Sequence, residues 1–170
     1  MKEFDPVSYE RFLQYAPDKH ELLSQAVTQK LDDYVSANSF AKYPYVLDVG
    51  AGQGNLSIPL LSRLENLAAE VVNKFLVAFV EPDVQMLLKL TQRLDERYSS
   101  EGKTFEVLVR DSFEALENSR FFPSGYCSFI LAAHVFYYFD RWPEQIHKIM
   151  ELLAVRGAAC VVLKSTKTDL

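Results

Sequence analysis

The sequence predicts an α/β protein built around a doubly wound parallel sheet. Segments that are apolar along their whole length alternate with segments that carry apolar residues every three or four positions. Fully apolar strands are typical of a sheet covered on both faces, and amphipathic helices provide that cover. A glycine-rich stretch, VLDVGAGQGN at 46–55, continues directly from the first predicted strand. Right-handed connections between successive strands then give the doubly wound arrangement.

The elements alternate along the chain. Residues 20–35 carry apolar side chains at helical spacing, and Pro17 and Asp18 suit the start of that helix. Pro59 lies early enough in the second long helix to occupy its first turn, and Asp83 is placed to cap the next helix. The expected helices are 7–14, 20–35, 55–72, 83–98 and 143–155, and the expected strands are 45–50, 74–82, 103–111, one within 125–139, and 157–165. We expect the five strands to be parallel, in the spatial order 3-2-1-4-5.

Length and composition fit one globular domain. The chain has 170 residues, of which 49% are hydrophobic and 24% are charged. We expect a single domain over 1–170, with N-terminal helices in 1–40 and the sheet-bearing core in 45–164. The net charge of −5 argues against a nucleic acid or an anionic membrane as partner. No apolar run is long enough to span a bilayer and the N-terminus lacks a signal-peptide pattern, so we expect a cytoplasmic location.

Cysteine and histidine residues give no sign of a disulfide framework or a metal site. Cys127 and Cys160 both fall in predicted strands, where we expect buried and unreactive thiols. His20 and His147 fall on predicted helices without the spacing of metal ligands, so we expect ordinary surface or core histidines.

The glycine-rich stretch 50–54 fits several kinds of loop. Glycine permits positive φ and lets a ligand approach the backbone, so we expect a branched side chain at Gly50 to occupy ligand space. A phosphate-binding loop ending in Gly-Lys-Ser or Gly-Lys-Thr is all but excluded, because Asn55 follows Gly54. A dinucleotide-binding loop needs a third glycine where Asn55 stands, and Glu81 comes later than the acidic residue of that pattern. A tight turn without a ligand is the remaining alternative.

Ligands of doubly wound sheets bind at the carboxyl ends of the strands. Glu81 ends the second strand, where a carboxylate can accept two hydrogen bonds from a ribose diol. Asp111 and Ser112 end the third strand, where Asp111 can accept a hydrogen bond from an adenine amino group. A helix cap or a solvated charge is the alternative for each residue, and for Asp83 and Ser112 taken singly it is the favoured one. Together these residues form a more specific pattern than any of them alone.

This joint pattern resembles that of the class I S-adenosylmethionine-dependent methyltransferases. VLDVGAGQGN corresponds to their first motif, VEPD to the acidic end of the second strand, VRDS to the end of the third, and FILAAHVFYYF to the fourth. The resemblance spans 46–164 and implies a Rossmann-like methyltransferase fold with S-adenosylmethionine as cofactor. It implies that loop 50–54 holds the methionine moiety, Glu81 the ribose, and Asp111 with Ser112 the adenine. The cofactor-binding residues expected on this basis are Asp48, Gly50, Ala51, Gly52, Gly54, Glu81, Pro82, Asp111, Ser112 and Ala133.

Within that family the chain looks most similar to histamine N-methyltransferase-like enzymes. The similar segments are SYERFLQYAPDKHELL, VEPDVQ and HVFYYFDRWPEQIHKIMELL. This resemblance implies that Asp18 pairs with a cationic amine and that Tyr137 and Tyr138 line the acceptor pocket. His134 replaces an amide-type residue of the family, and ordinary packing is the alternative for the aromatic stretch 136–139. The candidates for the acceptor side are Tyr9, Asp18, His134, Tyr137 and Tyr138.

We therefore expect a methyltransferase that acts on a small-molecule acceptor, an amine by resemblance. The sulfonium methyl group is already activated, so holding the two reactants in line supplies much of the acceleration. A nearby histidine or carboxylate can help to remove the amine proton. A cofactor-binding or interaction module of the same fold, catalytically weak or inactive, is the alternative, and a dehydrogenase is a more distant one.

The end of the sequence departs from the family pattern. The chain stops at LKSTKTDL, whereas complete class I methyltransferases continue with a helix and an antiparallel hairpin that close the acceptor pocket. We expect either a shortened protein or a fragment. An uncovered edge strand pairs readily with another strand, so we expect a homodimer or a partner chain over 158–164. The isolated chain is then expected to bind the cofactor but to turn over slowly or not at all.

Overall fold

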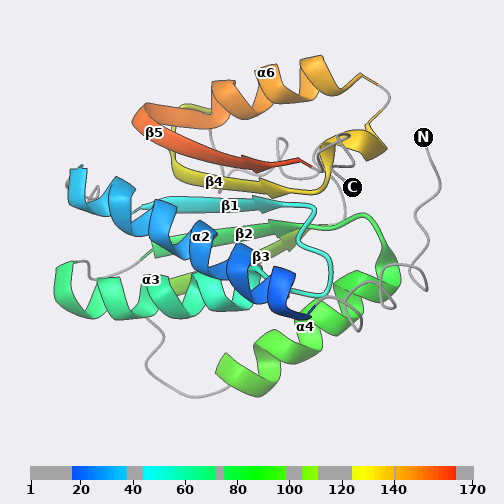
Figure 1. Ribbon diagram of the computed structural model, residues 1–170, viewed down its shortest axis with the longest axis horizontal. Helices are drawn as coiled ribbons and strands as arrows, with labels where there is room; N and C mark the ends of the chain where they lie inside the picture. Colours follow the sequence, from blue (N-terminus) through cyan, green and yellow to red (C-terminus); the bar gives the residue numbers. More distant parts are fainter. Residues whose placement is uncertain are drawn as a thin grey trace.

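The computed structural model confirms a parallel five-stranded sheet in the order β3-β2-β1-β4-β5. It describes residues 17–37, 44–71, 75–98, 105–110, 124–139 and 141–163, with the backbone alone for 17–20, 68–71, 105–110 and 137. The order of the strands and their common direction are those expected from the alternation of elements (Figure 1). The helix expected at 7–14 lies outside the described residues.

The described elements follow the predicted alternation closely. The helices are α2 (Pro17–Ala37), α3 (Ser57–Val71), α4 (Val84–Tyr98) and α6 (Trp142–Leu152), with a 3₁₀ turn η1 (Phe136–Tyr138). The strands are β1 (Tyr45–Val49), β2 (Phe75–Val80), β3 (Phe105–Arg110), β4 (Cys127–Ala133) and β5 (Leu153–Val162). Helix α2 begins three residues before the predicted start, at Pro17, and Pro59 lies in the first turn of α3 as expected.

Two apolar cores lie on the two faces of the sheet. Successive side chains of a strand point to opposite faces, so Val46 of β1 joins one core and Leu47 joins the other. Helices α2, α3 and α4 pack on the first face, and α6 with η1 packs on the second. The alternation explains why the strands read as continuous apolar runs, because both sets of side chains are buried.

The strand register brings the carboxyl ends of β1, β2 and β4 to one edge of the sheet. Val49, the last residue of β1, pairs with Val80 on one side and with Ala132 on the other. The loops that follow these three strands therefore meet at the same edge, on the right in Figure 1. This is the edge at which doubly wound sheets bind their ligands.

The start of β5 differs from the prediction. The sequence predicts a helix to 155 and a strand from 157, whereas α6 ends at Leu152 and β5 begins at Leu153. The pairing with β4 then shifts, from Cys127 opposite Leu153 to Phe129 opposite Ala158. The residues of β5 between Leu153 and Ala158, which this shift leaves out of the regular pairing, include Gly157. A Cβ on Gly157 would lie 2.6 Å from the Cys127 carbonyl oxygen. The two backbones approach so closely there that a side chain at position 157 would not fit.

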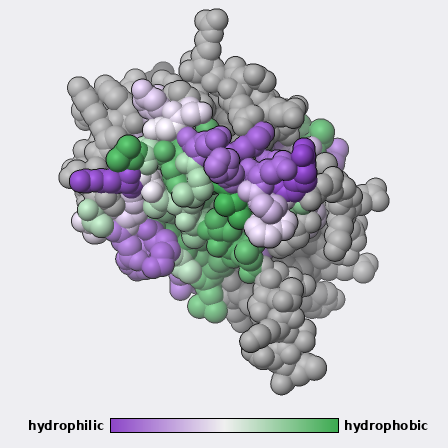
Figure 2. All heavy atoms as spheres, turned by 90° about the horizontal axis from the view of Figure 1, so that it is seen from above, coloured by the Kyte–Doolittle hydropathy of each residue, from purple (hydrophilic) through white to green (hydrophobic). Residues whose placement is uncertain are grey.

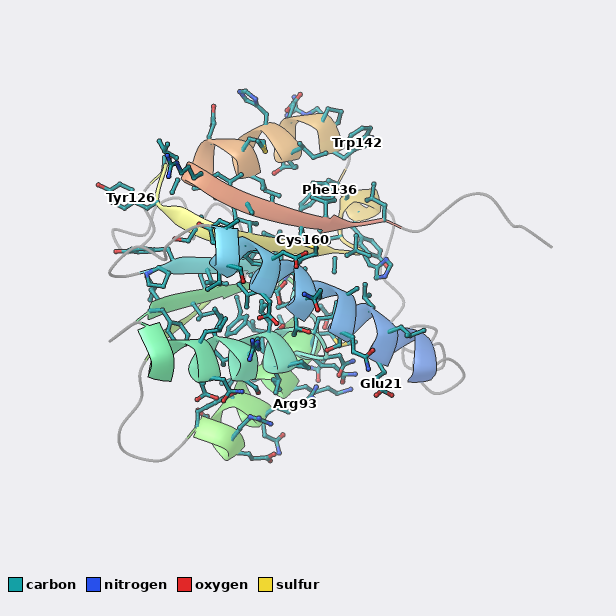
Figure 3. The ribbon with its side chains drawn as sticks, turned by 60° about the vertical axis from the view of Figure 1, so that its left-hand side comes forward. Glu21, Arg93, Tyr126, Phe136, Trp142 and Cys160 are labelled. Carbon is teal, nitrogen blue, oxygen red and sulfur yellow. The ribbon has the colours of Figure 1, made fainter. Side chains whose placement is uncertain are left out.

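Strand β5 forms an edge of the described sheet. Cys160 of β5 faces the first core and is half-buried rather than fully buried, whereas Cys127 is buried as predicted (Figure 3). Burial raises the pKa of both thiols, which keeps them protonated at neutral pH and agrees with the expected lack of reactivity.

Among the described residues, no helix combines the length and the apolarity that crossing a membrane requires.

Candidate cofactor site

The loop after β1 is fastened to the neighbouring strand by its first two amides. The N–H groups of Gly50 and Ala51 both donate to the carbonyl oxygen of Val80, at 2.8 and 3.1 Å. The N–H of Gly54 then donates to Ala51 O at 3.0 Å, which closes a tight turn before α3 begins. All three glycines of the loop have positive φ, at 73°, 57° and 86° for Gly50, Gly52 and Gly54. The G-A-G-Q-G pattern is thus required by the backbone itself.

The glycines differ in what surrounds them. A Cβ on Gly50 would lie 2.7 Å from the Val135 side chain, and one on Gly54 would lie 2.7 Å from the Leu90 side chain. The expectation that a side chain at Gly50 would occupy ligand space is therefore wrong, because packing against Val135 excludes it first. A Cβ on Gly52 would meet nothing within 4 Å, so Gly52 gives the loop its open surface.

Glu81 holds the glycine loop together with the start of α4. One carboxylate oxygen accepts the Gly52 N–H at 2.7 Å, and the other accepts the Asp83 N–H at 2.8 Å. The residue is only 8% exposed, and this burial raises its pKa, while the two backbone N–H groups lower it. Each carboxylate oxygen keeps a second acceptor position, so Glu81 can bind the loop and a ligand hydroxyl together.

Asp83 caps α4, which is the alternative that the sequence favoured for it. Its Oδ1 accepts the N–H groups of Gln85 and Met86, both at 2.9 Å. This geometry satisfies two amides at the start of the helix that would otherwise lack intrahelical partners.

Asp48 is a buried carboxyl group at the end of β1. It is 2% exposed, and its Oδ2 accepts the Ser57 hydroxyl at 2.6 Å from the first residue of α3. Its pKa is raised to about 7, chiefly by burial and also by the negative charge of Glu81, while the hydrogen bond from Ser57 lowers it. A positively charged ligand group beside this carboxyl would stabilise its ionised form.

A side chain from α4 holds the far end of the loop. Arg93 donates through Nη1 to the Gln53 carbonyl oxygen at 2.7 Å and to the Asn55 Oδ1 at 2.8 Å. The sequence indicates Asn55 only as a residue that excludes other kinds of loop, and nothing in it points to Arg93. No local pattern signals this contact, because Arg93 and Asn55 lie 38 positions apart and meet only through the β2–α4 connection.

These elements surround a small hollow at the carboxyl edge of the sheet. Its cavity volume is about 30 Å³, and the lining residues are Asp48, Gly50, Ala51, Asn55, Leu56, Ala133 and His134. Sites for drug-sized ligands usually enclose ~300–1,000 Å³, so the hollow takes one small group of a larger ligand.

His134 lines this hollow in an uncommon backbone conformation. Its φ is 57°, in the left-handed region, and its N–H donates to the Val162 carbonyl oxygen at 2.9 Å. A non-glycine residue held in that region costs about 1–2 kcal/mol, although histidine visits it more readily than most residues. The contact with β5 fixes the point at which the chain leaves β4 and places the imidazole beside the hollow.

The aromatic stretch after β4 divides between packing and the site. Phe136 is 3% exposed in the second core, so the packing alternative is correct for it. Tyr138 is half-buried, and burial together with the negative charge of Glu81 raises its pKa. The charge of Glu81 thus acts on Tyr138, whose expected place on the acceptor side stays a prediction. Tyr137 lies in η1 and Asp18 in the first turn of α2, but neither side chain is described.

Of the remaining predicted site residues, the structure describes one and leaves three outside its described ranges. Pro82 follows β2 between Glu81 and Asp83, at the same edge of the sheet. Tyr9, Asp111 and Ser112 lie outside the described residues, so their expected roles stay predictions. Ser57 was missed, although a serine that opens a helix after a glycine loop is a recognisable signal. Among the described residues, no group of three or more His, Cys, Asp or Glu side chains is placed to hold a metal ion.

Several solved structures with a similar fold are described as methyltransferases. One is a SAM-dependent methyltransferase from Aquifex aeolicus, with 20% identity, 99% of this chain and 78% of that chain covered, and a TM-score of 0.61. The CurJ carbon methyltransferase is 17% identical, with 81% of this chain and 34% of that chain covered and a TM-score of 0.63. The DszA carbon methyltransferase is 18% identical, with 89% of this chain and 37% of that chain covered and a TM-score of 0.61. No protein-family model and no curated protein matches the sequence.

The chain therefore has the fold of the class I S-adenosylmethionine-dependent methyltransferases, as its sequence motifs imply. It spans about a third of the length of the two carbon methyltransferases and about three quarters of the Aquifex aeolicus protein. The narrower resemblance to histamine N-methyltransferase-like enzymes is not shown by these similarities.

Proposed function

We propose that this chain binds S-adenosylmethionine at the carboxyl edge of its sheet and transfers the methyl group to a small molecule. The observation that carries the proposal is the joint placement of Glu81, Asp48 and the open surface of Gly52 around one loop. In a methyltransferase fold, these groups stand at the edge where the strands end and ligands bind.

The residues at this edge fit the chemistry of the cofactor. Glu81 has acceptor positions for a ribose diol, because its two backbone partners use one position on each oxygen. Asp48 supplies a buried carboxyl group, and a ligand ammonium group would compensate its charge. Gly52 leaves space over the backbone for close approach. We assign the adenine to the segment around Asp111 and Ser112, on sequence grounds alone.

The chain has to orient the acceptor, exclude water and receive a proton. S-adenosylmethionine, when bound, would supply an activated methyl carbon to which a nucleophile with a free electron pair bonds while the carbon–sulfur bond breaks and S-adenosylhomocysteine leaves. His134 lines the hollow and can accept the proton that an amine loses. Tyr138 follows β4 at the same edge of the sheet, where it would face the acceptor. We infer an amine acceptor from the similarity of the N-terminal segment and Asp18 to enzymes that methylate amines.

A second candidate acceptor is a carbon nucleophile. The names of two structural neighbours describe carbon methyltransferases, although their identities to this chain are only 17% and 18%. A carbon acid also loses a proton, so His134 serves either reaction. A catalytically weak cofactor-binding module of the same fold is the further alternative.

A methylation assay with labelled S-adenosylmethionine tests the proposal. A panel of small amines and of activated carbon acids should give product with at least one acceptor class. Replacement His134→Gly removes the imidazole while suiting the positive φ, so the fold should keep its stability. Loss of a general base predicts turnover reduced about 100-fold or more, with cofactor affinity unchanged.

His147→Ala is the matched control, because His147 is an exposed histidine of α6 that pairs with Glu151. This variant should keep full turnover. Cofactor binding without product from any acceptor would favour the binding module. Equal turnover in His134→Gly and the unaltered protein would remove His134 from the reaction.

A further inference from the structure

Arg93 and Asn55 form a pair that connects α4 with the hollow. Arg93 is half-buried on α4, between α3 and α4 in Figure 3, and its Nη1 reaches the loop before α3. The Nη1 lies 2.8 Å from Asn55 Oδ1 and 2.7 Å from the Gln53 carbonyl oxygen. Asn55 itself lines the hollow beside Asp48. The arginine thus contacts the loop from outside, and the asparagine faces the ligand side.

The chemistry of the pair fixes the orientation of the Asn55 amide. A guanidinium group has donors and no acceptor, so the group that Asn55 turns toward Arg93 must be its oxygen. The amide nitrogen, with its two N–H donors, is then the group left for the hollow. The hollow accordingly combines a donor, Asn55 Nδ2, with an acceptor, the Asp48 carboxyl.

We propose that Arg93 is a positioning residue that sets the ligand preference of the hollow through Asn55. The pair of Asn55 as donor and Asp48 as acceptor matches the carboxylate and the ammonium of an amino acid group. Arg93 keeps the donor turned inward, since without it the amide can rotate and present its oxygen to the ligand carboxylate. This inference rests on the proposed cofactor, whose amino acid group would be the one recognised.

The helix that carries Arg93 also carries a matched control. Arg97 lies one turn further along α4, is exposed, and donates through Nη2 to the Ser62 hydroxyl at 2.7 Å. Replacement of either arginine by methionine removes one positive charge from the same helix, and only Arg93 contacts the loop. A non-specific effect of charge would therefore be similar in the two variants.

Calorimetric titrations with S-adenosylhomocysteine and with 5′-methylthioadenosine, which lacks the amino acid group, test the inference. Arg93→Met should weaken S-adenosylhomocysteine binding about tenfold or more, as expected for a lost hydrogen bond to a charged group. The affinity for 5′-methylthioadenosine should change by less than about twofold, and Arg97→Met should alter neither affinity. Arg93→Lys keeps one donor and should recover part of the loss.

The substitution Asn55→Leu tests independently whether Arg93 acts on the ligand through Asn55. It should weaken S-adenosylhomocysteine to the same extent as Arg93→Met, and the double variant should bind no more weakly than either single variant. Equal losses for both ligands in Arg93→Met, or no loss, would overturn the inference while leaving the cofactor assignment intact. If the unaltered chain bound neither ligand, the proposed function would fail and this inference with it.

Discussion

Gly52 combines a left-handed backbone conformation with an open surface. Its φ of 57° lies in the left-handed region, and a Cβ there would meet nothing within 4 Å. Gly125, in the turn before β4, has a φ of 77° and the same open surroundings. We expect Gly52→Ala and Gly125→Ala each to lower the free energy of unfolding by about 1 kcal/mol, because an L-residue is disfavoured there. Urea unfolding measures this loss.

The two glycine variants should differ in ligand binding. Gly52 lies in the loop at the carboxyl edge and donates to Glu81, whereas Gly125 lies before β4 and donates to the Glu151 carbonyl oxygen. Gly52→Ala should therefore weaken S-adenosylhomocysteine binding, and Gly125→Ala should leave it unchanged. Equal affinities for the two variants would contradict the placement of the ligand over Gly52.

Asp48 makes the stability of the chain depend on pH. Its folded-state pKa is raised by burial from 3.8 to about 7, so its protonated form stabilises the fold. This contribution is fully present below about pH 4 and is lost as the pH rises through about 7. Asp48→Asn carries no charge at any pH and keeps an acceptor for Ser57. The stability of Asp48→Asn relative to the unaltered chain should rise by ~1–4 kcal/mol between pH 4 and 8.

Urea unfolding of both proteins across this range gives the difference directly. Glu81, whose pKa is also raised by burial, is present in both proteins, so its titration largely cancels in the difference. A difference in stability that does not change with pH would show that Asp48 is not a buried group with a raised pKa.

The stability of helix α4 depends on the residue that caps its N-terminus, Asp83. Asp83 Oδ1 accepts two backbone N–H groups at the start of the helix, both at 2.9 Å. Asp83→Ala should reduce the free energy of unfolding by about 1 kcal/mol, the usual cost of losing such a cap. Asp95→Ala, which removes an exposed aspartate from the same helix, should change it by less than about 0.5 kcal/mol. Equal effects of the two substitutions in urea unfolding would contradict the capping role.

The strands and most helix boundaries could be predicted because their signals are local. Apolar runs, the glycine loop, and Asp83 before an amphipathic segment each depend on neighbouring residues. The start of β5 could not, since the approach of Gly157 to the Cys127 carbonyl belongs to the pairing of two distant segments. Glu81 and Asp48 could be proposed from their places at strand ends, whereas the contact of Arg93 with Asn55 forms only after folding brings α4 to the loop.

At the scale of the whole molecule, β5 presents an edge and an apolar surface. Seen from the side of α6 and β5, hydrophobic surface forms a band beside hydrophilic side chains (Figure 2). The exposed large apolar residues of α6, of β5 and of the residue that follows β5 are Trp142, Met150, Val155, Val161 and Leu163. In the described sheet β5 pairs with β4 alone, so its outer edge offers backbone groups to a further strand.

We propose that a second copy of the chain pairs with this edge, in line with the expectation from the sequence. Sedimentation velocity should then show a dimer, and Val161→Lys should shift it toward monomer, because a charge on an edge strand opposes pairing. Val84→Lys is the control, since Val84 is 62% exposed on α4, away from β5. A monomer at all concentrations would contradict self-association, and robust turnover by that monomer would show that the site needs no second chain.

Calorimetric titration of the chain with S-adenosylhomocysteine, compared with NAD, decides whether the carboxyl edge of the sheet holds this cofactor. Binding of S-adenosylhomocysteine is the predicted result. Glu81→Ala should weaken it by ~1–3 kcal/mol, because the ligand hydroxyls lose a buried acceptor. Circular dichroism shows whether the variant keeps its fold. Unchanged affinity in a folded Glu81→Ala variant, or binding of NAD in place of S-adenosylhomocysteine, would contradict the account.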